Sequence, residues 1–264
     1  MSAVFPLALA GFLAAALPVS AQDALRADLA ADSSLPTTLE LGPKNREPDF
    51  EFGLTAGVHG RFSLPFGAAD RDITGYAGSG GAVIVVDQNI SWNQLFRAGW
   101  GAEAEIDIMV GSTRQRGHEF RYGAYLVLEE DHYDSDSVTD DFGGKMKVDD
   151  LSMNTFIVGG KVVQPLGDHI FTSGRMGVGA VHYSQVEATF SGPLVAPFTG
   201  EFIRDTWTFA FEVKGYAGLK LGPVNLVAGM GLRILFPPSE GDAVSLSSGL
   251  FYTFDVEVGV EIGF

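Results

Sequence analysis

The C-terminal segment 250–264 alternates strictly between apolar and other side chains, and no other feature constrains the fold as much. A β-strand places successive side chains on opposite faces, so one face is wholly apolar while the other carries Asp255, Glu257 and Glu261. Three carboxylates facing an apolar core would be strongly destabilising. An apolar face toward lipid and a polar face toward a lumen is typical of transmembrane β-barrels. The segment therefore predicts the last strand of such a barrel, ending in Phe264.

The N-terminal part of the chain has a different composition. Residues 1–21 contain no charged side chain and end in the small-x-small motif of Val19 to Ala21, which predicts a signal peptide cleaved after Ala21. A membrane anchor is disfavoured because Pro18 interrupts an apolar run that is too short to span. Residues 22–49 mix Ala, Pro and charge without a β period, so we expect a partly disordered periplasmic lead-in. The barrel is expected over 50–264.

Composition excludes several classes of function. The chain has no cysteine, which removes disulfides and thiolate chemistry, and we expect no cofactor. Its formal net charge of −16 disfavours nucleic acid as a partner, because phosphate binding requires clustered Lys and Arg. No segment reaches the length of a transmembrane helix, so a membrane location requires strands.

Seven further segments show the same alternation as the C-terminal one. They are 50–62, 97–110, 118–129, 151–158, 170–186, 206–221 and 225–236. In the fourth segment, the pattern assigns Leu151 and Met153 to the lipid face and Phe156 and Val158 to the lumen. A bulge near His182 is expected to change the phase of the fifth.

Connections between the segments alternate in length. The links at 111–117, 164–168 and 221–225 are short, and those at 63–96, 130–147, 187–205 and 237–248 are long. Outer-membrane barrels have short periplasmic turns and long extracellular loops. The fold class we predict is therefore all-β: an eight-stranded antiparallel up-and-down transmembrane β-barrel in the bacterial outer membrane. Its narrow interior is expected to be filled by side chains.

Most charged side chains of these segments fall on the predicted lumen face. That polar network is expected to contain Glu51, His59, Arg61, Glu103, Glu105, Asp107, Arg121, Arg175, Glu212, Lys214, Arg233, Asp255, Glu257 and Glu261. Buried charges must be paired or hydrated, and both signs are present. The set is interpreted as a salt-bridge plug, with a gate or selectivity filter as the alternative. Barrel closure makes Arg61 and Arg233 the expected partners of the three C-terminal carboxylates.

At this point the chain resembles the small outer-membrane β-barrels of Gram-negative bacteria, the superfamily that includes the OmpA, OmpX and OmpW types. The resemblance covers residues 50–264 and rests on the signal peptide, the alternating segments, the loop alternation and the terminal Phe264. It implies that Phe264 and the preceding apolar positions form the signal read by the barrel-assembly machinery. It also implies outer-membrane lipids as partners, and it matches no subfamily-specific motif.

The leading hypothesis for function is a non-enzymatic barrel with a surface-structural or adhesion role through its extracellular loops. A second hypothesis is a narrow channel for small solutes. A third is a lipid-A-modifying hydrolase, since lipid A deacylases carry a Ser, a His and an acid at the outer rim and His182 and Ser184 share a strand face. The acidic loop 130–147 could bind an extracellular ligand or a divalent cation through Asp134, Asp136, Asp140 and Asp141, although it lacks the EF-hand pattern. Asp131 and His132 in that loop also suggest a protease dyad, whose usual barrel has ten strands.

Overall fold

A computed structural model of the protein describes residues 53–76, 83–115, 118–139, 143–193, 195–241, 244–245 and 249–264. The predicted signal peptide, the predicted lead-in and Glu51 lie outside these residues. Within the described residues, no helix is long and apolar enough to cross a membrane.

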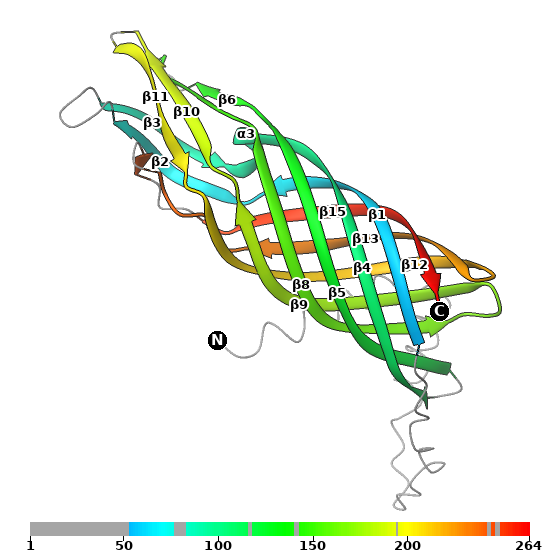
Figure 1. The fold of residues 1–264 in the computed structure, drawn as a ribbon. Coiled ribbons are helices and arrows are strands. Elements are labelled where there is room, and N and C mark those ends of the chain that lie inside the picture. The colour runs from blue at the N-terminus through cyan, green and yellow to red at the C-terminus, as the bar shows by residue number, and fades with distance from the viewer. Residues whose placement is uncertain are drawn as a thin grey trace, which may run out of the picture. The chain divides into compact units, whose positions relative to one another are not determined.

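Eight long antiparallel strands close into a barrel (Figure 1). They are β1 (Gly53–Phe66), β4 (Phe96–Gln115), β5 (His118–Ser135), β8 (Leu151–Pro165), β9 (Ile170–Tyr183), β12 (Thr206–Leu221), β13 (Val224–Leu235) and β15 (Phe251–Gly263). Each strand pairs with its neighbours in the barrel, and β1 pairs with both β4 and β15, which completes the ring. The predicted eight-stranded antiparallel barrel is confirmed.

The seam between β1 and β15 fixes the register of the whole ring. Arg61 lies opposite Glu257 across this seam, and Val58 lies opposite Val260. A one-residue slip would turn the carboxylates of β15 outward into the apolar face, so the alternating sequence specifies the register strongly. On the other side of β15, Asp255 lies opposite Gly231 of β13.

The short and long connections lie at opposite ends of the barrel. Strands β12 and β13 are joined by Gly222 and Pro223 alone, and Gly222 has the positive φ of 72° that such a tight turn requires. Strands β8 and β9 are joined by residues 166–169. The start of β1 and the end of β15 lie at this same end, which is the periplasmic end of an outer-membrane barrel.

The long connections at the extracellular end contain structure of their own. They form β2 (Ala68–Tyr76), β3 (Val83–Ser91), α3 (Trp92–Leu95), β6 (Ser137–Thr139), β7 (Lys145–Val148), β10 (Val186–Gly192), β11 (Val195–Ile203) and β14 (Val244–Ser245). Strands β11, β10, β7 and β6 make one sheet, and β14, β2 and β3 make another. Much of what the sequence suggested to be loop is therefore ordered β-structure.

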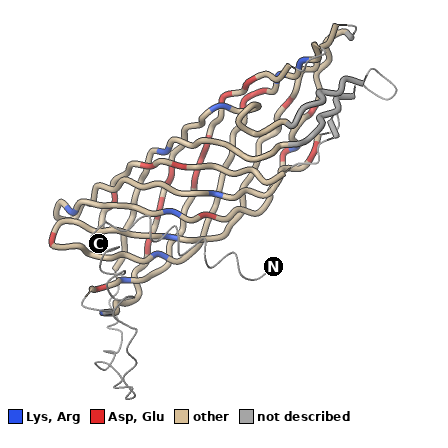
Figure 2. Tube along the Cα trace, turned by 180° about the vertical axis from the view of Figure 1, so that it is seen from behind, with Lys and Arg blue, Asp and Glu red and all other residues tan. Residues whose placement is uncertain are grey.

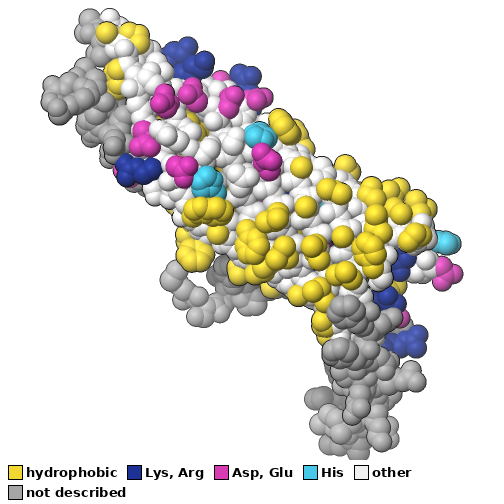
Figure 3. Space-filling view, in the orientation of Figure 1, with side chains coloured by type: hydrophobic (Ala, Val, Ile, Leu, Met, Phe, Trp, Pro, Cys, Tyr) yellow, Lys and Arg dark blue, Asp and Glu magenta, His cyan; other side chains and the backbone are white. Residues whose placement is uncertain are grey.

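The outer surface of the barrel carries a broad band of exposed apolar side chains (Figure 3). Val58 is 65% exposed, Val178 58% and Val258 63%, values that would be costly in water. The band covers the barrel on the side that Figure 3 displays and gives way to charged side chains toward the extracellular end. This surface fits a lipid environment, as the sequence pattern indicated.

The predicted phase of the fourth segment is wrong. Phe156 and Val158 of β8 point outward and are 39% and 42% exposed, whereas Leu151, Met153 and Ile157 are fully buried inside. The rule that apolar side chains face lipid holds only at membrane depth. The extracellular part of the barrel has an apolar interior, so the inward residues there are apolar too. The pairing of β9 is regular through Tyr183, so there is no bulge at His182 itself. The expected change of phase occurs directly after it, since Tyr183 and Val186 are both buried across the break between β9 and β10.

Candidate functional site

The barrel interior gathers most of the predicted polar network. Figure 2 shows how residues of both charges are distributed along the strands of the barrel. The buried members are His59, Arg61, Glu103, Glu105, Asp107, Arg175, Glu212, Lys214, Arg233, Asp255, Glu257 and Glu261. Arg121 does not join them. It lies near the periplasmic end of β5, its side chain is 40% exposed, and its Nε donates to Glu119 at 2.8 Å.

The periplasmic part of the network is centred on Lys161 of β8. Its ammonium donates to Glu105 at 2.7 Å and to Glu261 at 3.2 Å, and it also contacts Asp107. The three carboxylates come from two strands, so Lys161 joins β8 to β4 and β15 across the lumen.

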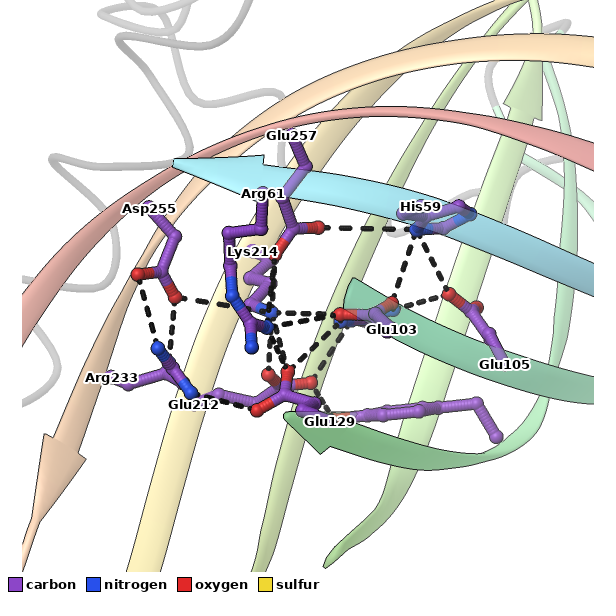
Figure 4. Close-up of polar contacts among 12 residues, drawn as sticks. His59, Arg61, Glu103, Glu105, Glu129, Glu212, Lys214, Arg233, Asp255 and Glu257 are labelled. Carbon is purple, nitrogen blue, oxygen red and sulfur yellow. Dashed lines mark hydrogen bonds and ion pairs between the residues drawn. The ribbon is translucent and has the colours of Figure 1, made fainter. Parts of the chain in front are cut away.

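The middle of the network contains Arg175 and Lys214. Figure 4 shows Lys214 with the carboxylates around it. Both Nη atoms of Arg175 donate to Glu103 at 2.7 Å, a bidentate geometry that is among the strongest charged contacts. The guanidinium of Arg175 also lies 5.2 Å from the ring centres of Tyr125 and Tyr216, so it is held between two aromatic rings. Its Nε forms an ion pair with Glu212 at 2.9 Å.

Lys214 contacts four carboxylates from this middle position. Its Nζ lies 2.6 Å from Glu257, 2.8 Å from Glu129, and 3.1 Å from both Glu103 and Glu212. An ammonium has three protons, so these distances describe shared donors in a dense network. Every one of these groups is buried, and removing Lys214 would leave four buried carboxylates with one cation fewer.

The extracellular part of the network is formed by two arginines that share their acceptors. Arg61 lies 2.6 Å from Glu129 and 2.7 Å from Asp131, and Arg233 lies 2.8 Å and 2.7 Å from the same two residues. Arg233 also donates from Nε to Asp255 at 2.7 Å.

The expected partners of the C-terminal carboxylates are thus present in two cases. Asp255 pairs with Arg233, and Glu257 lies 3.5 Å from Arg61. The expectation for Glu261 is wrong, because Glu261 pairs with Lys161. The sequence pattern did not predict that Lys161 faces the lumen, since the phase of β8 had been assigned the wrong way round.

Negative charge exceeds positive charge in this interior. The buried carboxylates are Glu103, Glu105, Asp107, Glu129, Asp131, Glu212, Asp255, Glu257 and Glu261, against the cations Arg61, Lys161, Arg175, Lys214 and Arg233. Neutral donors satisfy part of the excess, since Tyr125 donates to Glu212 at 2.8 Å and Tyr216 donates to Glu257 at 2.6 Å. His59 Nδ1 lies 3.1 Å from Glu103.

Three groups in the interior have the ligand spacing of a metal site. They are His59 with Glu103 and Glu105, Glu103 with Glu129 and Glu257, and Glu105 with Asp107 and Glu261. Side-chain cations already occupy these positions. Lys161 contacts every member of the third group, Lys214 every member of the second, and Arg175 both carboxylates of the first. The arrangement is that of an internal salt-bridge plug.

An apolar core lies above the charges, at the extracellular end of the barrel. Trp92 of α3 is fully buried, and its ring lies 5.0 Å from that of Phe251. Phe251 also contacts Tyr133 and Tyr183 in edge-to-face geometry, with ring centres 5.8 Å and 6.4 Å apart. The interior therefore contains two layers, buried charged side chains and, toward the extracellular end, buried aromatic side chains.

Three interior charges were not included in the network predicted from sequence. Asp131 was assigned to a loop because β5 was expected to end at Glu129, and the strand extends to Ser135. Lys161 lies beyond the Gly159 and Gly160 pair, where the segment was taken to have ended. Glu129 shares a strand face with Tyr125, and its inward direction was visible in the alternation.

The candidate residues of the outer rim are placed differently from the expectation. His182 Nε2 lies 2.8 Å from Asp205, an acidic partner that the sequence did not reveal. The Ser184 hydroxyl accepts a hydrogen bond from the backbone of Ser152 at 3.1 Å. Asp131 and His132 do not form a dyad, because Asp131 points into the lumen while His132 points outward.

The acidic residues after β5 do not converge in the described part of the chain. Asp136 accepts a hydrogen bond from Arg97 Nε at 3.0 Å, and this contact lowers its pKa below the usual value for aspartate. Asp134 is exposed, and Asp140 and Asp141 lie outside the described residues. A divalent cation in this loop stays a prediction.

Comparisons with known proteins give a fold-level likeness. No family model and no curated protein matches the chain. Among solved structures, the chain is similar to Ail, the attachment invasion locus protein of Yersinia pestis, at 10% identity and a TM-score of 0.34 over 81% of this chain and 100% of Ail. It is also similar to the outer membrane protease OmpT of Escherichia coli, at 12% identity and a TM-score of 0.38 over 86% and 99%. Neisserial surface protein A matches at 10% identity and a TM-score of 0.31 over 81% and 97%. Similarities this weak carry no information on what this chain binds or catalyses.

Proposed function

We propose that this protein is a closed outer-membrane barrel whose role is to hold ordered β-structure outside the cell for a surface-structural or adhesive interaction. The observation that carries the proposal is the combination of an interior filled with buried side chains and a packed extracellular sheet. A solute would have to cross both the charged network and the aromatic core, and eight strands leave little space for either to be bypassed.

The extracellular sheet shares the apolar core at the top of the barrel, which distinguishes it from a set of flexible loops. Met146, Val148, Ala188, Phe190 and Phe202 are all fully buried. Burial of this kind orders the backbone before any partner arrives, so association does not have to supply the ordering entropy. A rigid platform above the membrane favours an interaction role over a channel role.

The face of this sheet that is exposed to water is polar and mixed in charge. Lys145 and Lys147 of β7 are exposed, as is Glu187 on β10. Thr189 and Thr199 form a hydroxyl pair at 2.9 Å between β10 and β11. A polar face of this composition suits recognition of another polar surface rather than insertion into lipid.

The test is removal of the end of the β10–β11 hairpin. Residues 189–199 are replaced by Asn-Gly, which joins the paired positions Ala188 and Gly200 through a two-residue turn. We expect the barrel to assemble, with its heat-modifiable gel mobility retained, while attachment of expressing cells to surfaces and to one another is lost.

A matched control changes the periplasmic turn instead. Pro223→Ala lies at the other end of the barrel and should leave attachment unchanged. The proposal would be contradicted if cells expressing the intact protein, cells expressing the trimmed protein and cells expressing neither attached equally well.

A further inference from the structure

Polar side chains form a row on the outer face of the barrel, at the extracellular border of the apolar band. Figure 3 shows histidine and acidic side chains next to the apolar residues at this border. The row is made by Glu130 and His132 on β5, Ser152 and Asn154 on β8, His182 on β9, and Ser184 directly after β9. It is independent of the interior network because alternate residues of the same strands face the lumen.

Three of these residues are linked by one hydrogen bond and one ion-pair contact. His132 lies opposite Ser152 in the pairing of β5 with β8, and its Nδ1 is 2.8 Å from the Ser152 Oγ. The other ring nitrogen, Nε2, lies 3.2 Å from Glu130 Oε1. A hydroxyl, an imidazole and a carboxylate in this order are the components that make a serine nucleophilic.

Neighbouring groups hold the histidine and the serine in place. The Trp100 ring lies 4.7 Å from the His132 ring, and the two are opposite each other in the register of β4 and β5. The Ser152 N–H donates to Ser184 Oγ at 3.1 Å, and the Ser184 N–H donates to the Ser152 carbonyl at 2.9 Å. The serine therefore sits on strand backbone that is fixed by pairing, the kind of rigid support that a catalytic group needs.

The position of Glu130, His132 and Ser152 on the barrel indicates which molecules can reach them. Leu128 lies on the same face of β5 as Glu130, two residues closer to the membrane, and is 55% exposed. Phe156 lies opposite it on β8 and is also exposed. Ser152 lies opposite His132, four residues along the strand from the paired Leu128 and Phe156, a distance of about 13 Å. Trp100, 62% exposed beside His132, is a residue type enriched at membrane interfaces. The exposed Trp100 therefore places the row at the headgroup level of the membrane interface.

We propose that Ser152, His132 and Glu130 form a hydrolytic site for the acyl esters of outer-leaflet lipids. Ser152 Oγ attacks the ester carbonyl while its proton passes to His132 Nδ1. The tetrahedral intermediate expels the lipid alcohol, which takes that proton. Water then attacks the acyl-serine with His132 as base, which releases the fatty acid and restores the serine.

The remaining groups have supporting roles. Glu130 stabilises the imidazolium that forms when the proton is transferred. Asn154, exposed on the same face of β8 two residues from the serine, offers an amide donor for the developing oxyanion. Ser184 is not the nucleophile, because its hydroxyl already accepts a hydrogen bond from the Ser152 backbone and His182 is paired with Asp205.

The experiment uses the full chain reconstituted in two kinds of vesicle. One contains diacyl phosphatidylethanolamine and the other contains lipopolysaccharide, so the arm that releases fatty acid identifies the lipid. Ether-linked phospholipid vesicles are the negative control because they contain no acyl ester. Free fatty acid is measured by mass spectrometry, and a fluorophosphonate probe reports which serine becomes labelled.

We expect release in one of the ester arms, labelling on Ser152, and a loss of at least about 10³-fold in Ser152→Ala and His132→Gln. His182→Gln is the matched control and should stay within a few-fold of the intact protein. Heat-modifiable mobility shows that each variant is folded. No release in either ester arm, or an undiminished rate in Ser152→Ala, would overturn the assignment, and neither result bears on the adhesive role or on closure of the lumen.

Discussion

Arg233 provides the sharpest test of the charged network. It is fully buried and donates to Glu129 at 2.8 Å, to Asp131 at 2.7 Å and to Asp255 at 2.7 Å. Arg233→Met keeps most of the side-chain volume and removes the charge. Arg61 still neutralises Glu129 and Asp131, but Asp255 loses its bidentate partner, and the next cation, Lys214, is 4.0 Å away. Breaking a buried pair in this way costs about 3–5 kcal/mol.

The compensating change is Asp255→Asn, which removes the carboxylate left unpaired. In a double-mutant cycle, the two substitutions together should cost about 1–3 kcal/mol less than the sum of the single substitutions, because the double variant contains no orphaned charge at this position. The free energy of unfolding is measured by urea titration in detergent micelles with tryptophan fluorescence. A single-variant cost below about 1 kcal/mol, or strict additivity, would refute the assignment of this pair as a buried and mutually dependent one.

Three further predictions follow from other parts of the molecule. Gly177→Ala should destabilise the barrel by about 1–3 kcal/mol in the same urea titration, because its Cβ would lie 2.2 Å from the Tyr125 hydroxyl; an unchanged midpoint would contradict this packing. Deleting Phe264, which is 79% exposed on the outer face, should lower the amount of heat-modifiable barrel in the outer membrane without changing total synthesis, and normal levels would mean that it carries no assembly signal. The Asp136 carboxyl should titrate below the usual range for aspartate in a carbon-13 NMR experiment, because Arg97 holds its charged form. The local contact is then present at neutral pH and lost only as the pH falls through that lowered pKa, and Arg97→Ala should bring the pKa back up; the same titration curve in both proteins would exclude the contact.

Strand number, order and the identity of most lumen residues could be predicted because they depend on a local pattern. Alternation along β15 determines which side chains face inward wherever one face meets lipid, and it placed Asp255 and Glu257 correctly. The same rule failed for Phe156 because membrane depth is a three-dimensional property. Above the membrane, apolar side chains occur both inside the barrel and on part of its outer face. The alternation of apolar and polar residues therefore cannot identify which face of a strand points into the lumen there.

Partners across the lumen were the least predictable feature. Lys161 meets carboxylates from β4 and β15, residues separated by 54 to 100 positions in sequence, and only closure of the ring brings them together. The contact between His132 and Ser152 has the same origin, since it depends on the register of β5 against β8. Spacing along the chain favoured His182 and Ser184 because they share one strand.

The claim that the barrel is sealed is tested most directly by conductance across planar bilayers. Refolded protein with heat-modifiable mobility is inserted, and current is recorded over a range of voltage and pH, with a known porin as the positive control. The packed charges around Lys214 and the aromatic residues around Phe251 predict a silent bilayer. Discrete, reproducible conductance steps from the intact protein would contradict the account.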